Sequence, residues 1–216
     1  MKIRTLFLLL ILAGVIIYQK GGFHSFSSFP DPSNMQPAAG SNASSPFAMA
    51  APNNPVQDSA RKVPPISKDN FIITPLASYS IEALVLSKKN YSSGTEARLS
   101  PTDLALGWGP MSSKEVLQHM KISQSGRWYH YRYQGSIPIH PKEIITHSAN
   151  THIIPANNEV HASLKKIKQY DVVQMRGYLV SITTQNGNWR WKSSTTRADS
   201  GDGSCELFYV ISLSIK

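Results

Sequence analysis

The chain has 216 residues and a formal charge of +9, with 41% hydrophobic residues and one cysteine, Cys205. This length indicates one domain with additional material rather than two full domains, and a single cysteine excludes an intramolecular disulfide. Residues 71–216 hold 16 Lys and Arg against 10 Asp and Glu. That balance favours an anionic partner, and it is also common in proteins that lie beside anionic membranes.

The N-terminus has the features of a membrane segment. Residues 5–18 are uncharged and apolar, Lys2 and Arg4 precede them, and Lys20 follows. Such a run is either a signal peptide or a short anchor, and the lack of small residues after it favours an uncleaved signal-anchor over residues 1–20. Because the basic residues lie mainly before the run, we expect a cytoplasmic N-terminus and an exported remainder.

Residues 21–70 are rich in Gly, Ser, Pro, Asn and Ala and show neither helical nor strand periodicity. A segment of this composition buries too little apolar surface to offset the entropy lost on ordering. We therefore expect a disordered linker over residues 21–70 and a folded domain over residues 71–216.

Alternating apolar and polar residues predict strands in that domain, at residues 78–86, 127–133, 171–182 and 205–213. A capping-box pattern at Ser112 predicts a helix through Met120. A second helix is expected to begin at Asn157 or Asn158 and to continue to Ile167, because apolar residues recur there at helical spacing.

The dipeptide Asn186-Gly187 between two strand-like runs predicts a hairpin with a two-residue turn, which places Ile182 opposite Trp191. The expected fold is therefore α+β, with a mostly antiparallel, barrel-like sheet and two or three short helices. Residues 171–180 resemble the first strands of oligonucleotide/oligosaccharide-binding barrels.

The densest cluster of functional side chains is at residues 147–152, where His147, Asn150 and His152 occur together. Imidazoles with an amide between them can act as ligands, or as a general base with an orienting group. Zinc-binding helices carry their histidines four residues apart with an acidic residue, and this pattern is absent, so no metal site is predicted. The structural alternative places His147 at a helix end and His152 on a strand.

A polar, glycine-punctuated segment at residues 193–206 separates two strands and is longer than a turn requires, which is typical of functional loops. Its candidate ligand-binding side chains are Ser194, Arg197, Asp199, Asp202 and Glu206. The acidic residues could bind a cation, although their spacing differs from that of an EF-hand. Arg197 with neighbouring hydroxyls and glycine amides would equally suit a phosphate or carboxylate. The alternative is a network of turn hydrogen bonds.

Three phrases, at residues 126–129, 147–155 and 193–206, are similar to phrases in a family of uncharacterised proteobacterial membrane-anchored proteins. The resemblance covers the globular part of the chain. It implies a single-pass protein of the inner membrane with a periplasmic C-terminal domain, and it implies no catalytic residue.

The leading hypothesis is a periplasmic binding module for an anionic or carbohydrate ligand, or for a protein partner in the cell envelope. Residues 147–152 and 193–206 would form its site; no cofactor is expected, and nucleic acid is not favoured. The rival hypothesis is a metal-assisted periplasmic hydrolase in which His147 or His152 acts as base and Asp199 or Asp202 holds a cation. A third alternative is a structural component of the envelope.

Overall fold

Strands are the main secondary structure in the chain that the structure describes. The structure is a computed structural model, and it describes residues 46–60, 62–196 and 204–216. The strands are β1 (Val56–Ser59), β2 (Ile66–Lys68), β3 (Phe71–Asn90), β4 (Thr102–Gly107), β5 (Met120–Ser125), β6 (Trp128–Tyr133), β7 (Ser148–Pro155), β8 (Val172–Thr184), β9 (Arg190–Lys192) and β10 (Glu206–Ile215). The helices are α1 (Thr95–Leu99), α2 (Lys114–Leu117), α3 (Pro141–Thr146) and α4 (Asn158–Lys166), with a 3₁₀ turn η2 (Gly109–Ser112).

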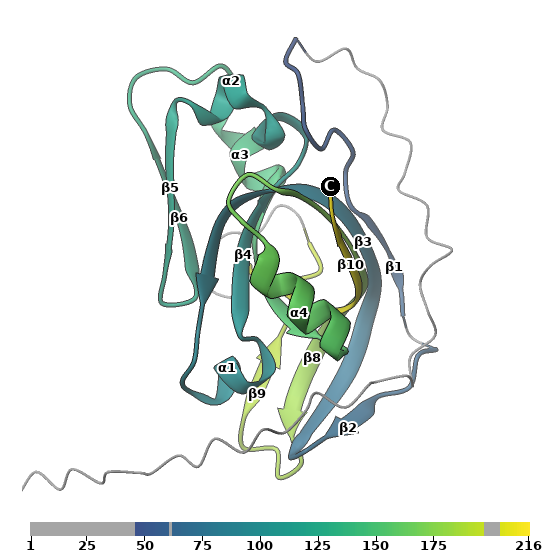
Figure 1. Ribbon diagram of the computed structural model, residues 1–216. Coiled ribbons are helices and arrows are strands. Elements are labelled where there is room, and N and C mark those ends of the chain that lie inside the picture. The colour runs from purple at the N-terminus through teal and green to yellow at the C-terminus, as the bar shows by residue number, and fades with distance from the viewer. Residues whose placement is uncertain (1–45, 61, 197–203) are drawn as a thin grey trace, which may run out of the picture.

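Five strands pair into a closed ring, in the order β3, β4, β7, β10, β8 and back to β3 (Figure 1). All pairs in the ring are antiparallel except β7 with β10, which is parallel. Strand β3 has 20 residues and pairs with both β4 and β8. Its register shifts after Pro75 and after Val85, and each shift bends the strand. The bends allow β3 to pair with both of its neighbours in the ring.

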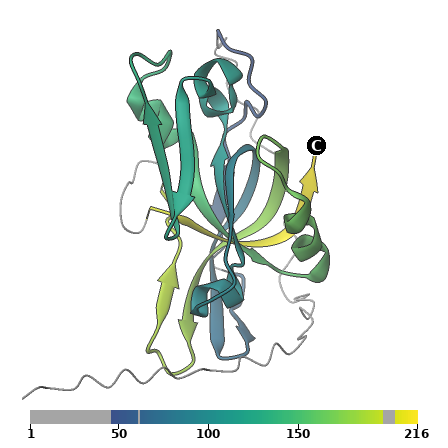
Figure 2. The same cartoon turned by 60° about the vertical axis from the view of Figure 1, so that its left-hand side comes forward.

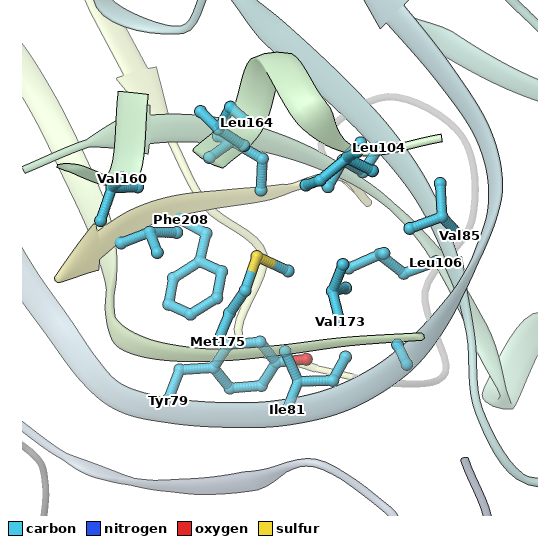
Figure 3. Close-up of a cluster of buried hydrophobic side chains, with 14 of the residues drawn as sticks. Tyr79, Ile81, Val85, Leu104, Leu106, Val160, Leu164, Val173, Met175 and Phe208 are labelled. Carbon is cyan, nitrogen blue, oxygen red and sulfur yellow. The ribbon is translucent and has the colours of Figure 1, made fainter. Parts of the chain in front are cut away.

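The ring encloses an apolar interior. Figure 3 shows Tyr79, Met175 and Phe208 pointing toward one another inside it. Helix α4 adds Val160 and Leu164 to this cluster, and the Asn157 side chain accepts a hydrogen bond from the backbone N–H of Val160 to begin the helix. Each strand therefore contributes apolar residues through its own alternating pattern, but the core is complete only when the ring closes.

The segment between β4 and β7 is a long insertion. It contains η2, α2, the separate two-stranded sheet β5–β6 and α3, which Figures 1 and 2 show beside the ring. One face of the β5–β6 hairpin is half-buried against a separate apolar cluster that includes Leu86, Met111 and Ile144, through Met120, Ile122, Tyr129 and Tyr131. The opposite face is exposed.

Most of the predicted elements are present. The class is α+β with a largely antiparallel sheet, as expected, and the described residues form four α-helices where two or three were expected. Helix α4 and the register of Ile182 with Trp191 are confirmed. The helix predicted from Ser112 through Met120 is wrong in extent: α2 covers only Lys114–Leu117 and Met120 begins β5, because a hairpin follows at once.

The folded domain begins earlier in the chain than the expected boundary at residue 71. Residues 46–70, assigned by composition to the linker, contribute β1 and β2, which both pair with β3. Ala51, Ala60 and Ile66 are buried there, so a composition poor in apolar residues still supplies core contacts. The membrane segment predicted at residues 1–20 lies outside the described residues. Within the described ranges no helix is long and apolar enough to cross a bilayer.

Candidate functional site

The antiparallel register of β4 and β7 places Asp103 directly opposite His152. The Asp103 carboxylate is fully buried, and its Oδ1 lies 2.9 Å from Nδ1 of His152. The angle falls outside that of a hydrogen bond, so the contact is electrostatic and becomes an ion pair when the imidazole is protonated. A buried carboxylate is costly unless a positive group compensates it.

The compensating charge comes from the tip of the β5–β6 hairpin. Ser125 pairs with Trp128, and the two residues between them, Gly126 and Arg127, have φ values of 56° and 69°, as in a type I′ turn. Arg127 Nη1 donates to Asp103 Oδ1 at 2.7 Å and its Nη2 donates to the carbonyl of Ser100 at 3.0 Å. A left-handed conformation costs a long side chain free energy, and these contacts hold it in place.

Tyr91 and Asn150 complete the attachment of the hairpin tip. The Arg127 guanidinium lies 3.9 Å from the centroid of the Tyr91 ring, and the Arg127 backbone N–H donates to the Tyr91 hydroxyl. Asn150 Nδ2 donates to the Arg127 carbonyl at 2.9 Å, and Asn150 Oδ1 accepts from Gln124 of β5 at 2.7 Å. Burial raises the pKa of Tyr91, and the negative charge of Asp103 acts in the same direction.

Aromatic side chains continue outward from this cluster along β9 and the start of β3. The ring of Trp191 is 4.8 Å from that of His152 and 5.6 Å from the Arg127 guanidinium. Trp189 follows at 6.1 Å from Trp191, and Phe71 at 5.8 Å from Trp189. We call Tyr91, Arg127, Trp191, Trp189 and Phe71 the aromatic strip. Tyr91, Trp189 and Trp191 are half-exposed, so the strip has both a supported side and a side open to solvent.

The two predicted histidines do not come together. His147 ends α3, where its Nδ1 lies 3.1 Å from both the Glu143 carbonyl and the Thr146 hydroxyl. The extended β7 then separates it from His152 by about 16 Å, at roughly 3.3 Å per residue. A site that uses both imidazoles is therefore excluded, and the structural alternative for His147 agrees with its position.

The other predicted residues divide between two faces of the sheet. Glu206 is buried and accepts a hydrogen bond from Thr151, its register partner, whereas Asn150 and His152 flank Thr151 and face the other way. Ser194 is buried in a short turn, where its hydroxyl accepts from the Thr196 backbone N–H, as the turn-network alternative proposes. Arg197, Asp199 and Asp202 lie outside the described residues.

Glu206 also lines a small pocket at the end of the ring interior. The pocket is bounded by Trp108, Ile145, Ser148, Ala149, Thr196, Ser204 and Glu206. Cys205 faces the other side with Asn150, whose Nδ2 is 3.7 Å from the Cys205 Sγ. Across the described parts of the chain no group of three His, Cys, Asp or Glu side chains is arranged to hold a metal ion.

Sequence reasoning missed Asp103 and Tyr91, and assigned Arg127 only to a strand. One signal was available: Asp103 is the single charged residue between Arg98 and Lys114, in an otherwise apolar strand, which indicates a buried carboxylate. The partner of that carboxylate is 24 positions away and leaves no local pattern. The chain matches no protein-family model, no curated protein and no solved structure. The function of the candidate site must therefore be inferred from its geometry alone.

Proposed function

We propose that this protein is a membrane-anchored binding module of the periplasm, and that the aromatic strip binds an anionic glycan of the cell envelope. Residues 1–20 would anchor it and the ring of strands would present the site. The observation that carries the proposal is the strip itself: four aromatic rings and one guanidinium in continuous succession, at 3.9–6.1 Å, with Tyr91, Trp189 and Trp191 half-exposed and Phe71 buried beneath Trp189.

The topology of the ring supports this proposal. Oligonucleotide/oligosaccharide-binding barrels have five strands and bind ligands on the face of strands two and three, with the loops joining strands one to two and four to five. Counted around this ring in chain order, those parts are β4 and β7, residues 91–101 and residues 185–205. Tyr91, Asp103, His152 and Trp191 all belong to them.

The chemistry of the strip supports a sugar ligand with acidic groups. Half-exposed Trp and Tyr rings offer apolar faces for stacking, while their buried edges are held by neighbours. Arg98 is exposed beside the strip and lies 5.8 Å from the centroid of the Phe71 ring, whereas Arg190 and Lys192 are exposed on the face of β9 opposite Trp191. Cations around stacking faces favour a ligand that carries carboxylate or phosphate groups.

The test is a binding measurement on the full chain in detergent or nanodiscs, with acidic and neutral envelope oligosaccharides as probes. Trp191→Ala and Trp189→Ala are each expected to raise the Kd about tenfold or more, equivalent to about 1.4 kcal/mol of binding free energy. Trp128→Ala is the matched control, because Trp128 is exposed on the hairpin and outside the strip. Equal losses in all three variants, or no binding of any acidic glycan, would contradict the proposal.

A hydrolase remains the second candidate, and one observation favours it. The Asp103 carboxylate lies 2.9 Å from Nδ1 of His152, the pairing of acid and imidazole that a general base uses, although the imidazole is buried and the contact lacks hydrogen-bond geometry. In that case His152→Ala would abolish turnover of a bound glycan while the Kd changed little. A purely binding function predicts no turnover in either protein.

A further inference from the structure

A second exposed surface lies away from the aromatic strip. Leu117, Met120, Lys121, Ile122, Gln169 and Tyr170 line a shallow groove between the start of the β5–β6 hairpin and the segment that joins α4 to β8. We call these six residues the Tyr170 patch. Half-buried Leu117, Met120 and Ile122 form its apolar part, and polar atoms make up the larger part of its lining. Tyr170 lies at its edge with 62% of its surface exposed.

The backbone of Tyr170 adopts a conformation that is unfavourable for a bulky side chain. Its φ of 72° lies in the left-handed region, which Gly or Asn adopts at low cost and a bulky side chain does not. Hydrogen bonds from Tyr170 N to the Val85 carbonyl and from Val85 N to the Asp171 carbonyl hold this conformation. More than half of the surface of this tyrosine faces solvent, and backbone strain of this kind is concentrated at binding and switch sites.

The surroundings of the patch are basic. Residues 114–121 and 165–171 contain five lysines against two acidic residues, Glu115 and Asp171. The negative end of α4 is neutralised, because Lys88 Nζ donates to the carbonyls of Leu164 and Ile167 at 2.6 and 3.0 Å. The patch therefore combines half-buried apolar side chains, an amphipathic aromatic ring and an excess of lysines, a composition that suits a surface lying on anionic lipid headgroups.

The described part of the chain also begins at the end of the molecule where the Tyr170 patch lies. Before the first described residue stand 45 residues, among them the apolar run 5–18. The chain enters the fold beside α2: Ala50 N donates to the Ser112 carbonyl, and Met49 forms a bridge with Ser113. Figures 1 and 2 both show this entry and α2 at one end of the molecule and the turn between β8 and β9 at the other. Leu117 of α2 belongs to the patch.

We propose that the Tyr170 patch docks onto the anionic phospholipid surface of the membrane that holds the N-terminal segment. Docking would direct the turn between β8 and β9, and with it Trp189 of the strip, away from the bilayer. This inference rests on the anchoring part of the proposed function and is independent of the glycan.

The experiment uses the full chain with Cys205→Ser and one introduced cysteine carrying an environment-sensitive dye. One version has His119→Cys, an exposed site between Leu117 and Lys121, and the control has Asn186→Cys at the opposite end. Each is reconstituted into vesicles of phosphatidylcholine alone or mixed with phosphatidylglycerol, with headgroup-spin-labelled lipid as quencher. We expect strong quenching at position 119 in the anionic vesicles and little at position 186.

Three variants of the position-119 protein sharpen the result. Lys121→Gln and Lys168→Gln should each weaken docking about fivefold, the effect of one lysine near an anionic surface. Tyr170→Asn should reduce quenching to the level of position 186 while the Tm stays equal or rises, because asparagine tolerates the left-handed conformation.

Equal quenching at positions 119 and 186, equal quenching in neutral and anionic vesicles, or no effect of Tyr170→Asn would each overturn the inference. Flotation separates this failure from failure of the anchor. A chain that floats with vesicles but keeps an unquenched dye at position 119 refutes the patch alone. A chain that does not float refutes the anchor, and with it the patch.

Discussion

At the scale of single residues, Asp103 connects three segments that are distant in sequence. Its carboxylate contacts Arg127 from the hairpin and His152 from β7, and all of its surface is buried. The Arg127 side chain is 19% exposed, so this is a largely desolvated pair. Removing one partner of such a pair leaves a buried charge uncompensated, which costs more than the intact pair contributes.

We therefore expect Asp103→Asn to lower the free energy of unfolding by about 3 kcal/mol. The double variant with Arg127→Met should lose less than the sum of the two single losses, by at least about 1 kcal/mol. Urea unfolding measures all three proteins. Asp58→Asn, a change at an exposed acid of β1, is the control and should stay within about 0.5 kcal/mol of wild type. Additive losses would mean that Asp103 and Arg127 do not interact.

A second residue, His161 of α4, makes stability depend on pH. Burial lowers the pKa of His161, and the nearby charges of Lys165 and Lys68 lower it further. The unfolded chain then binds a proton at a pH where the folded chain does not. Stability from this group is therefore complete above the unfolded pKa of about 6.5 and is lost as the pH falls below it.

The corresponding measurement is the Tm of wild type and His161→Gln at pH 7.5 and pH 5.5. We expect wild type to lose more stability on acidification than the variant does, since the variant lacks the titrating group. An equal loss in both proteins would assign the pH dependence to other residues.

At the scale of elements, closure of the ring depends on one glycine. Gly177 of β8 pairs with Val210 of β10, at the point where the register of β10 shifts. A Cβ on Gly177 would lie 2.0 Å from the Tyr209 carbonyl oxygen, which belongs to backbone and cannot rotate away. The extra residue of this bulge lies on β10, between Val210 and Ser212.

Gly177→Ala should accordingly destabilise the fold severely, by about 3 kcal/mol or more, because β8 and β10 must separate. Gly187→Ala is the comparison, since Gly187 has a φ of 72° but open space around its Cα. Its cost should be about 1 kcal/mol. Thermal unfolding of both variants decides between them, and similar losses would show that steric contact at the β8–β10 pair is not limiting.

At the scale of the whole molecule, the N-terminal strands extend the fold beyond the boundary that composition indicates. Strand β1 lies against the middle of β3, from Val56 opposite Ser80 to Ser59 opposite Ala77. Strand β2 covers the start of β3, and Ile66 is buried in the same cluster as Phe71 and Tyr178. These pairings cover a length of β3 whose apolar residues would otherwise meet solvent.

A chain that begins at residue 71 should therefore unfold at lower denaturant concentration than one that begins at residue 46. Burial of Ile66 alone contributes about 1.5–3 kcal/mol, and two buried alanines and the lost strand pairs add to it. We expect a difference of at least about 3 kcal/mol in the free energy of unfolding. Equal stability would place the domain boundary at residue 71 after all.

The sequence by itself determined the features that arise from neighbours along the chain. Helix α4 follows from one apolar stripe and the Asn157 cap, and the β8–β9 register follows from Asn186-Gly187. These depend on interactions within a few residues, which a single sequence contains directly.

Only the tertiary structure decided which distant residues meet. Ring closure through β3 with β8, the approach of Arg127 to Asp103, and the separation of His147 from His152 all depend on strand order and register. Strand periodicity states that a residue faces one side or the other, but it does not name the strand that will lie beside it. The site predicted from both histidines and one loop is therefore not formed as a unit, because the sheet places its described residues on two faces. A buried carboxylate lies at the centre of the cluster that forms instead.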